Sequence, residues 1–269
     1  MDRSLRAGRG LALCLVLFSA PPCAQAADEE IEVYLDDLAA PGHFGLDVHT
    51  NYVASGERVV AYPGADASLH RLRLTPEFAY GLTASVELGL YAPLLTIDQA
   101  GRFDAGGIKL RVKYIAPKPA AAAWFWGANL ELGRVDHALD ANPDNGELKL
   151  IAGTRHGPWT LGLNANIDFR ISGDQPSPTT LQWATKLTRT VQEGLDVGLE
   201  SYNGMGSVRH PVGLGQDEQS SFLVIDKSLR DWDLNLGLGR GYGTNPDRFI
   251  IKAIIGVPIE RLARRPAGL

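Results

Sequence analysis

The sequence predicts an all-β protein that forms a single antiparallel transmembrane β-barrel of about twelve strands. Three observations predict this fold class. The N-terminus has the features of an export signal, no later stretch approaches the ~18 consecutive apolar residues of a membrane-spanning helix, and segments with alternating apolar and polar residues recur along the rest of the chain. Such alternation gives a strand one apolar and one polar face.

Residues 1–26 are expected to be a secretory signal peptide. A positively charged start is followed by a short apolar stretch, residues 11–18, and by a small-x-small cleavage pattern, Ala24-Gln25-Ala26. The two cysteines, Cys14 and Cys23, lie inside this signal, so the mature protein is expected to contain no disulfide and no thiol nucleophile. A lipoprotein signal built on Cys23 is the rival interpretation, but the residues before it lack the leucine and small residues of such a signal.

The mature chain divides into three parts. Residues 27–42 are acidic and end in Pro41-Gly42, and they are expected to be a solvated periplasmic leader, with an interaction segment as the alternative. Residues 43–259 are expected to form the β-barrel. Residues 260–269 are expected to be a short, basic C-terminal tail.

The clearest strand is Trp159–Arg170. Its apolar side chains, from Trp159 to Phe169, fall on one side, and its polar side chains fall on the other. A tilted strand of roughly 10 residues is long enough to cross a bilayer, and aromatic residues at both ends of an apolar face mark the two membrane interfaces. A strand of a soluble sandwich can look similar, so the prediction depends on how often the pattern recurs.

The same pattern recurs before and after this strand. Each copy places apolar residues at every second position, toward lipid, and charged or small residues between them, toward the lumen. Pro76 interrupts the second copy, and the phase of the copy near 221–227 is ambiguous. In chain order the expected strands are 44–52, 72–80, 86–91, 108–114, 124–132, 147–155, 159–170, 181–187, 195–200, 221–227, 232–239 and 249–257.

The connections between these strands alternate between long and short. With both termini in the periplasm, every long connection is an extracellular loop and every short one is a periplasmic turn, as in bacterial outer-membrane barrels. A soluble sandwich has no reason to keep this alternation. Closure of the sheet also removes its edge strands, which a bilayer does not permit.

Three stretches of the chain resemble a known family. Residues 72–83 (LRLTPEFAYGLT), 86–90 (VELGL) and 247–257 (DRFIIKAIIGV) are similar to uncharacterised proteobacterial outer-membrane proteins that are grouped with the MetA-pathway phenol-degradation family of transporter-like proteins. The resemblance extends from about Glu32 to Ile259 and implies a barrel with a transport role and no catalytic motif. The chain departs from many barrels because it continues past the last strand instead of ending on an aromatic residue.

The inward positions carry charges of both signs. In one hypothesis, the basic residues of strands 72–80 and 108–114 share one wall, which favours anionic solutes. In the other, opposite charges pair across strands and fill a narrow lumen without ionic preference. The lumen-lining candidates are Arg71, Arg73, Glu77, Glu87, Lys109, Arg111, Lys113, Glu131, Lys149, Arg155, Asp168 and Arg170.

No catalytic residue, metal site or cofactor is predicted. The six histidines are scattered without the HxxxH or HExxH spacing of a zinc site on a helix. Outer-membrane phospholipases use an outward His–Ser pair, and His70 with Ser68 is the one candidate for such a pair. We expect His70 to be an interface residue instead.

The predicted function is an outer-membrane channel or facilitator for small hydrophobic or anionic molecules, and the protein is not expected to be an enzyme. Three alternatives remain: an outer-membrane lipid-modifying enzyme, a soluble periplasmic β-sandwich or lipocalin-like binding protein, and a purely structural barrel with a plugged lumen. The expected partners are outer-membrane lipid, a small-molecule solute and the outer-membrane assembly machinery. Nucleic acid is not expected, because the formal net charge is −5.

Overall fold

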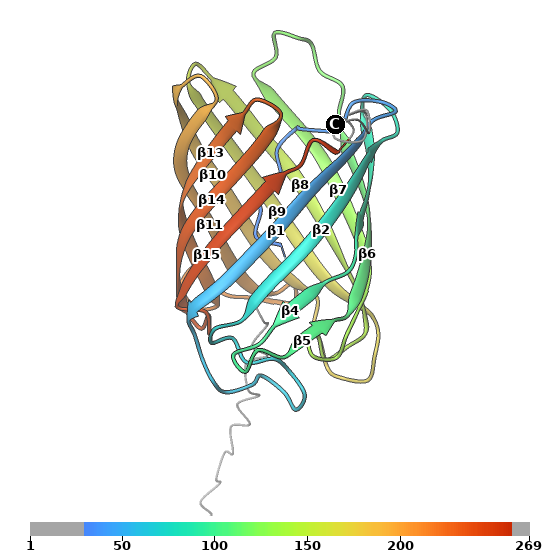
Figure 1. Ribbon diagram of the computed structural model, residues 1–269, viewed down its shortest axis with the longest axis vertical. Helices are drawn as coiled ribbons and strands as arrows, with labels where there is room; N and C mark the ends of the chain where they lie inside the picture. Colours follow the sequence, from blue (N-terminus) through green and yellow to red (C-terminus); the bar gives the residue numbers. More distant parts are fainter. Residues whose placement is uncertain (1–29, 260–269) are drawn as a thin grey trace, which may run out of the picture.

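The structure is a computed structural model, and it describes residues 30–259 of the chain. The expected signal peptide and C-terminal tail lie outside the described residues. Residues 44–256 wind into a closed antiparallel barrel (Figure 1), and β1 closes it by pairing with both β15 and β2. Among residues 30–259, no helix is long and apolar enough to cross a membrane.

Twelve long strands make the wall within the described chain, which confirms the predicted fold class. In chain order they are β1 (Phe44–Ser55), β2 (Leu72–Gly81), β3 (Val86–Tyr91), β6 (Gly107–Ile115), β7 (Trp124–Val135), β8 (Asp144–His156), β9 (Trp159–Ser172), β10 (Thr180–Gln192), β11 (Leu195–Ser207), β13 (Glu218–Leu229), β14 (Trp232–Gly243) and β15 (Phe249–Gly256). Three short strands, β4 (Leu95–Ile97), β5 (Phe103–Ala105) and β12 (His210–Pro211), extend connections between wall strands.

The wall has an apolar outside and a largely polar inside. On β6 the side chains of Ile108, Leu110 and Val112 are exposed on the outside, while Arg111 and Lys113 between them are buried inside. Tryptophans sit at strand ends on the outer face, as Trp124 and Trp159 show. This distribution follows from the period of two that a strand imposes on its side chains.

The phase of β13, ambiguous in the sequence, is settled by burial. Phe222 and Val224 are each 1% exposed and face inward, while Leu223 is 67% exposed and faces outward. The sequence is apolar on both faces of this strand because the inward face also packs against apolar residues. Those residues belong to the N-terminal segment described below.

The connections between strands alternate between the two ends of the barrel, and those at one end are mostly longer (Figure 1). The exception is the connection after β6, residues 116–123, which is as long as residues 136–143 after β7 and longer than residues 244–248 after β14. The long-loop end carries the connections after β1, β3, β7, β9, β11 and β14, and the short-turn end carries the others. One long connection is more ordered than predicted, because residues 95–105 form the β4–β5 hairpin instead of an irregular loop.

The expectation of a solvated leader is wrong for the described part of residues 27–42. Residues 30–40, here called the lumen segment, run inside the barrel toward the short-turn end, where the chain enters β1 (Figure 1). Val33 and Tyr34 are 2% and 1% exposed. The prediction was based on the acidic residues, which favour solvent. The apolar residues between them contact the barrel interior, and their burial places the segment inside.

Candidate functional site

The backbone of the lumen segment is held by side chains of the wall. Asn164 on β9 accepts a hydrogen bond from the Tyr34 backbone amide at 2.7 Å and donates one to the Tyr34 carbonyl oxygen at 2.9 Å. Lys252 on β15 donates from Nζ to the Ile31 carbonyl oxygen at 2.8 Å. These bonds satisfy backbone groups that would otherwise be buried without partners.

Two apolar patches on the inner wall receive the apolar residues of the lumen segment. Ile31 and Val33 pack in one cluster, and Tyr34 packs in the other with Leu35 and Leu38 against it. The wall residues are Ala184, Tyr202, Phe222, Val224 and Ile250 in the first cluster, and Ile115, Phe125 and Ile151 in the second. Inward apolar residues in a polar lumen are therefore explained by the segment that covers them.

A glycine lets the chain pass close to the wall before it enters β1. A Cβ atom on Gly81 would lie 2.2 Å from the Ala40 carbonyl oxygen, a backbone atom that cannot give way easily. Gly42 donates its backbone N–H to the Gly81 carbonyl oxygen at 2.7 Å, which fixes this crossing point. A glycine is required where two backbones approach this closely.

Asp36 anchors the segment at the short-turn end. It accepts a hydrogen bond from Lys118 Nζ at 2.7 Å and another from Arg155. Burial alone raises the pKa of Asp36, but the hydrogen bonds from Lys118 and Arg155 outweigh burial and hold that pKa below its ordinary value. The carboxylate is therefore ionised, and its contacts fasten the segment, at neutral pH.

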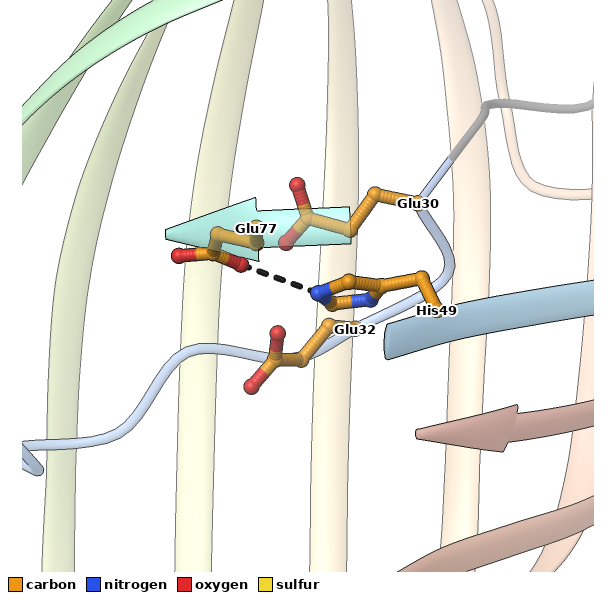
Figure 2. A group of neighbouring side chains, drawn as sticks. All are labelled: Glu30, Glu32, His49 and Glu77. Carbon is orange, nitrogen blue, oxygen red and sulfur yellow. Dashed lines mark hydrogen bonds and ion pairs between the residues drawn. The ribbon is translucent and has the colours of Figure 1, made fainter. Parts of the chain in front are cut away.

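A cluster of three carboxylates and one imidazole lies where the segment meets β1 and β2. Glu30 and Glu32 extend from the lumen segment toward His49 of β1 and Glu77 of β2 (Figure 2). His49 Nε2 lies 2.9 Å from Glu77 Oε2. One ligand atom from each of the four residues can be chosen so that all lie within 4.8 Å of one another.

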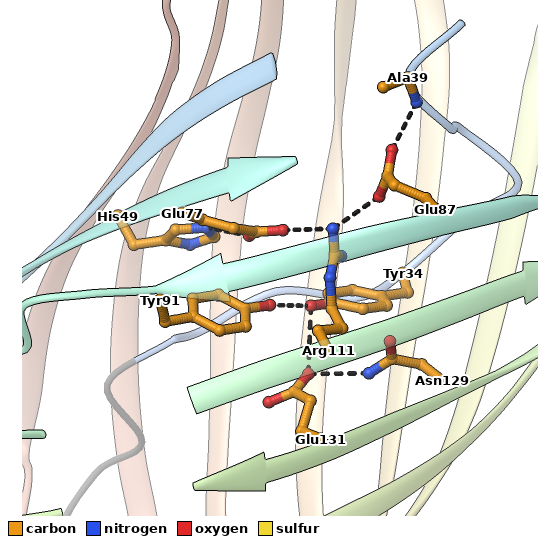
Figure 3. A network of polar contacts seen from close by, with 9 residues as sticks. All are labelled: Tyr34, Ala39, His49, Glu77, Glu87, Tyr91, Arg111, Asn129 and Glu131. Carbon is orange, nitrogen blue, oxygen red and sulfur yellow. Dashed lines mark hydrogen bonds and ion pairs between the residues drawn. The ribbon is translucent and has the colours of Figure 1, made fainter. Parts of the chain in front are cut away.

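Arg111 continues this cluster along the wall. Its Nη2 atom lies 2.5 Å from Glu77 Oε1 and 2.6 Å from Glu87 Oε1 (Figure 3). The other oxygen of Glu87, Oε2, accepts a hydrogen bond from the Ala39 backbone amide at 2.5 Å. Burial of a guanidinium is tolerated only when its charge is paired, and here two carboxylates pair with it.

Tyr34 is the centre of the polar network in Figure 3. Its hydroxyl lies 2.5 Å from the Tyr91 hydroxyl and donates to Glu131 at 3.4 Å. The ammonium groups of Lys149 and Lys113 lie 3.8 Å and 4.6 Å from the centre of its ring. Cations at such distances are attracted to the face of an aromatic ring.

A second buried ion-pair group lies across the lumen on β10, β11, β13 and β15. Lys186 Nζ lies 3.1 Å from Glu200 Oε1 and 2.8 Å from Asp226 Oδ2. The other Glu200 oxygen pairs with Lys252, the residue that also binds the Ile31 carbonyl. Charges of the two signs thus compensate each other on both sides of the lumen.

The sequence-predicted lumen residues fall into three zones. Glu77, Glu87, Arg111, Lys113, Glu131 and Lys149 surround the lumen segment, and Arg155 binds it at the short-turn end. Arg71, Arg73, Lys109 and Asp168 lie on inward positions nearer the long-loop end, where Arg71 pairs with Asp247 at 3.2 Å. Arg170 is exposed and donates to the carbonyl oxygens of Gly173 and Gln175 in the following loop.

Sequence reasoning placed some wall residues on the inward face by alternation but did not predict which residues connect the segment to the wall. These are Glu30, Glu32, Tyr34, Asp36, His49, Tyr91, Asn164 and Lys252. The sequence held one indication that a segment covers the inner wall, because Phe222, Val224 and Phe125 are apolar at inward positions. A break in the expected polarity of a lumen indicates that apolar residues from elsewhere cover it.

The His–Ser pair considered for a lipid-modifying enzyme does not form. His70 Nδ1 lies 2.9 Å from the Tyr52 hydroxyl, whereas the Ser68 hydroxyl binds the backbone of Glu57. The two side chains therefore have separate partners, and this geometry does not favour that alternative.

Several solved outer-membrane barrels have the same fold as this chain. The COG4313 outer membrane channel from Pseudomonas putida F1 superposes with a TM-score of 0.58 at 13% identity, over 84% of this chain and 99% of that one. The KdgM porin gives a TM-score of 0.52 at 9% identity, over 79% of this chain and 97% of that one. The NanC porin gives a TM-score of 0.51 at 10% identity, over 78% of this chain and 97% of that one.

At these identities the likeness establishes the barrel fold alone. No family model matches the chain, and no curated protein matches it either. The resemblance to the MetA-pathway phenol-degradation family therefore stays a prediction.

Proposed function

We propose that the protein is an outer-membrane channel for small solutes, and that the lumen segment controls passage through it. Three features support this proposal: the closed barrel with an apolar exterior, its polar interior, and the likeness to solved outer-membrane channels. In this proposal the short-turn end faces the periplasm and the long-loop end faces the outside.

The proposed control of solute passage is supported by the way in which the segment is attached to the wall. The segment is held by hydrogen bonds, ion pairs and two modest apolar clusters, and residues 30–259 contain no cysteine that could form a disulfide. A non-covalent plug can leave and return, whereas filling by wall side chains alone would be permanent.

The chemistry of the lumen supports weak rather than strong ionic preference. Arg111, the central member of the predicted basic wall, is paired with Glu77 and Glu87. Across the lumen, Glu200 pairs with two lysines. We therefore propose small solutes of low net charge as the cargo, and consider anionic solutes the second candidate.

The test is conductance in a planar bilayer for the mature protein and for a variant that lacks residues 30–38. We expect small or infrequent steps from the mature protein and larger, longer steps from the deletion variant. Heat-modifiable gel mobility shows that both barrels are folded. A deletion variant that inserts as a folded barrel and conducts nothing contradicts the channel function.

A further inference from the structure

We propose that Glu30, Glu32, His49 and Glu77 form a binding site for one divalent transition-metal cation that joins the lumen segment to the wall. Two ligands come from the segment, one from β1 and one from β2 (Figure 2). A cation bound by all four side chains would hold the segment in its docked position. The role of that docking rests on the proposed channel function, but the binding itself does not.

The donor set selects the class of cation. An imidazole nitrogen suits Zn²⁺ and similar transition metals, and carboxylate oxygens bind Zn²⁺ and Mn²⁺ as well. Ca²⁺ and Mg²⁺ prefer sites made of oxygen alone. The combination of one nitrogen with three carboxylates therefore favours Zn²⁺ or Mn²⁺ over the alkaline-earth ions.

The geometry is close to that of a bound state. The four ligand atoms lie within 4.8 Å of one another, and ligands of a tetrahedral Zn²⁺ at ~2.1 Å are separated by about 3.4 Å. Glutamate side chains have three rotatable bonds, so closure by this amount requires rotation of the side chains and no movement of the strands.

A buried carboxylate oxygen without a hydrogen-bond partner supports a cation at this cluster. The Oε1 atom of Glu30 is buried and has no hydrogen-bond partner among the described residues, and its carboxylate extends toward the His49 ring (Figure 2). A buried acceptor without a partner is costly. The cations around this cluster have other ion-pair partners, because Arg111 is shared between Glu77 and Glu87 and Lys149 pairs with Glu147. A metal ion would instead bind the Glu30 carboxylate directly.

The binding test uses the folded mature barrel and Zn²⁺ as the probe, in competition with a chromophoric chelator. We expect one equivalent to bind, with an affinity at least tenfold lower in Glu32→Gln and in His49→Gln. The control is Asp168→Asn, another inward carboxylate outside the cluster, which should leave the affinity unchanged. Absence of stoichiometric binding overturns the proposal, as does binding that both cluster variants retain.

A second measurement covers the case in which a cluster variant misfolds. Anomalous X-ray scattering from crystals of the mature protein soaked in Zn²⁺ should place the ion about 2 Å from a His49 ring nitrogen. An ion found only at exposed histidines such as His156 overturns the site. If Zn²⁺ binds at the cluster and neither the mature protein nor any variant conducts, the metal site is supported and the channel function is contradicted.

Discussion

At the residue scale, Asn164 is the wall residue that most directly holds the segment, because its one amide group satisfies both the N–H and the C=O of Tyr34. Asn164→Ala should weaken docking by about 1–3 kcal/mol, since two hydrogen bonds are lost. In single-channel records this appears as more frequent openings. Asn166→Ala is the matched control, because Asn166 binds Gln182 on the wall and not the segment; equal effects of the two variants would contradict this role.

The lowered pKa of Asp36 predicts that acid loosens the segment. A group whose pKa is lower in the folded state contributes stability above its unfolded value, and this contribution is lost as the pH falls through the folded value. Docking should therefore weaken as the pH drops below the ordinary aspartate value of 3.8. Conductance measured from neutral to acid pH should rise in this range, and Asp36→Asn should conduct more at neutral pH and show a smaller rise.

At the element scale, β13 offers two neighbouring residues with opposite surroundings. Leu223→Arg puts a charge on the outer face and should cost the barrel about 2–4 kcal/mol near the middle of the bilayer. Phe222→Ala should leave the barrel intact and weaken the cluster around Ile31 and Val33. Urea unfolding in lipid vesicles measures the first effect, and conductance measures the second. If Leu223→Arg changed only the conductance and Phe222→Ala destabilised the barrel, the assignment of the inward and outward faces of β13 would be contradicted.

Strand periodicity made most of the wall predictable from the sequence. Glu131 and Lys149 were placed inward by alternation alone, because a strand fixes the side of every residue. The contacts of the site were not predictable in this way. Tyr34 and Asn164 are 130 residues apart, and the acids of the leader indicated solvent, whereas burial of the intervening Ile31 and Val33 determined where the leader lies.

At the scale of the whole molecule, we expect the balance of buried charge to set the ion selectivity of the proposed channel. Arg111→Gln removes the cation shared by Glu77 and Glu87 and leaves both carboxylates without it. The variant should shift the reversal potential under a salt gradient toward cation preference, because the lumen gains net negative charge. Lys227→Gln, at the far end of β13, is the control. An unchanged reversal potential in Arg111→Gln would show that ions do not pass this network.

The bond between Lys252 and the Ile31 carbonyl joins residues 221 positions apart, which fixes an order of events in assembly. The segment is synthesised before every strand, yet half of its binding surface lies on the last strands to be made. Contacts between distant parts of a chain form late, because their loop-closure entropy must be overcome first. Because Lys252 lies on β15, the segment can complete its contacts only after the last strand has joined the wall.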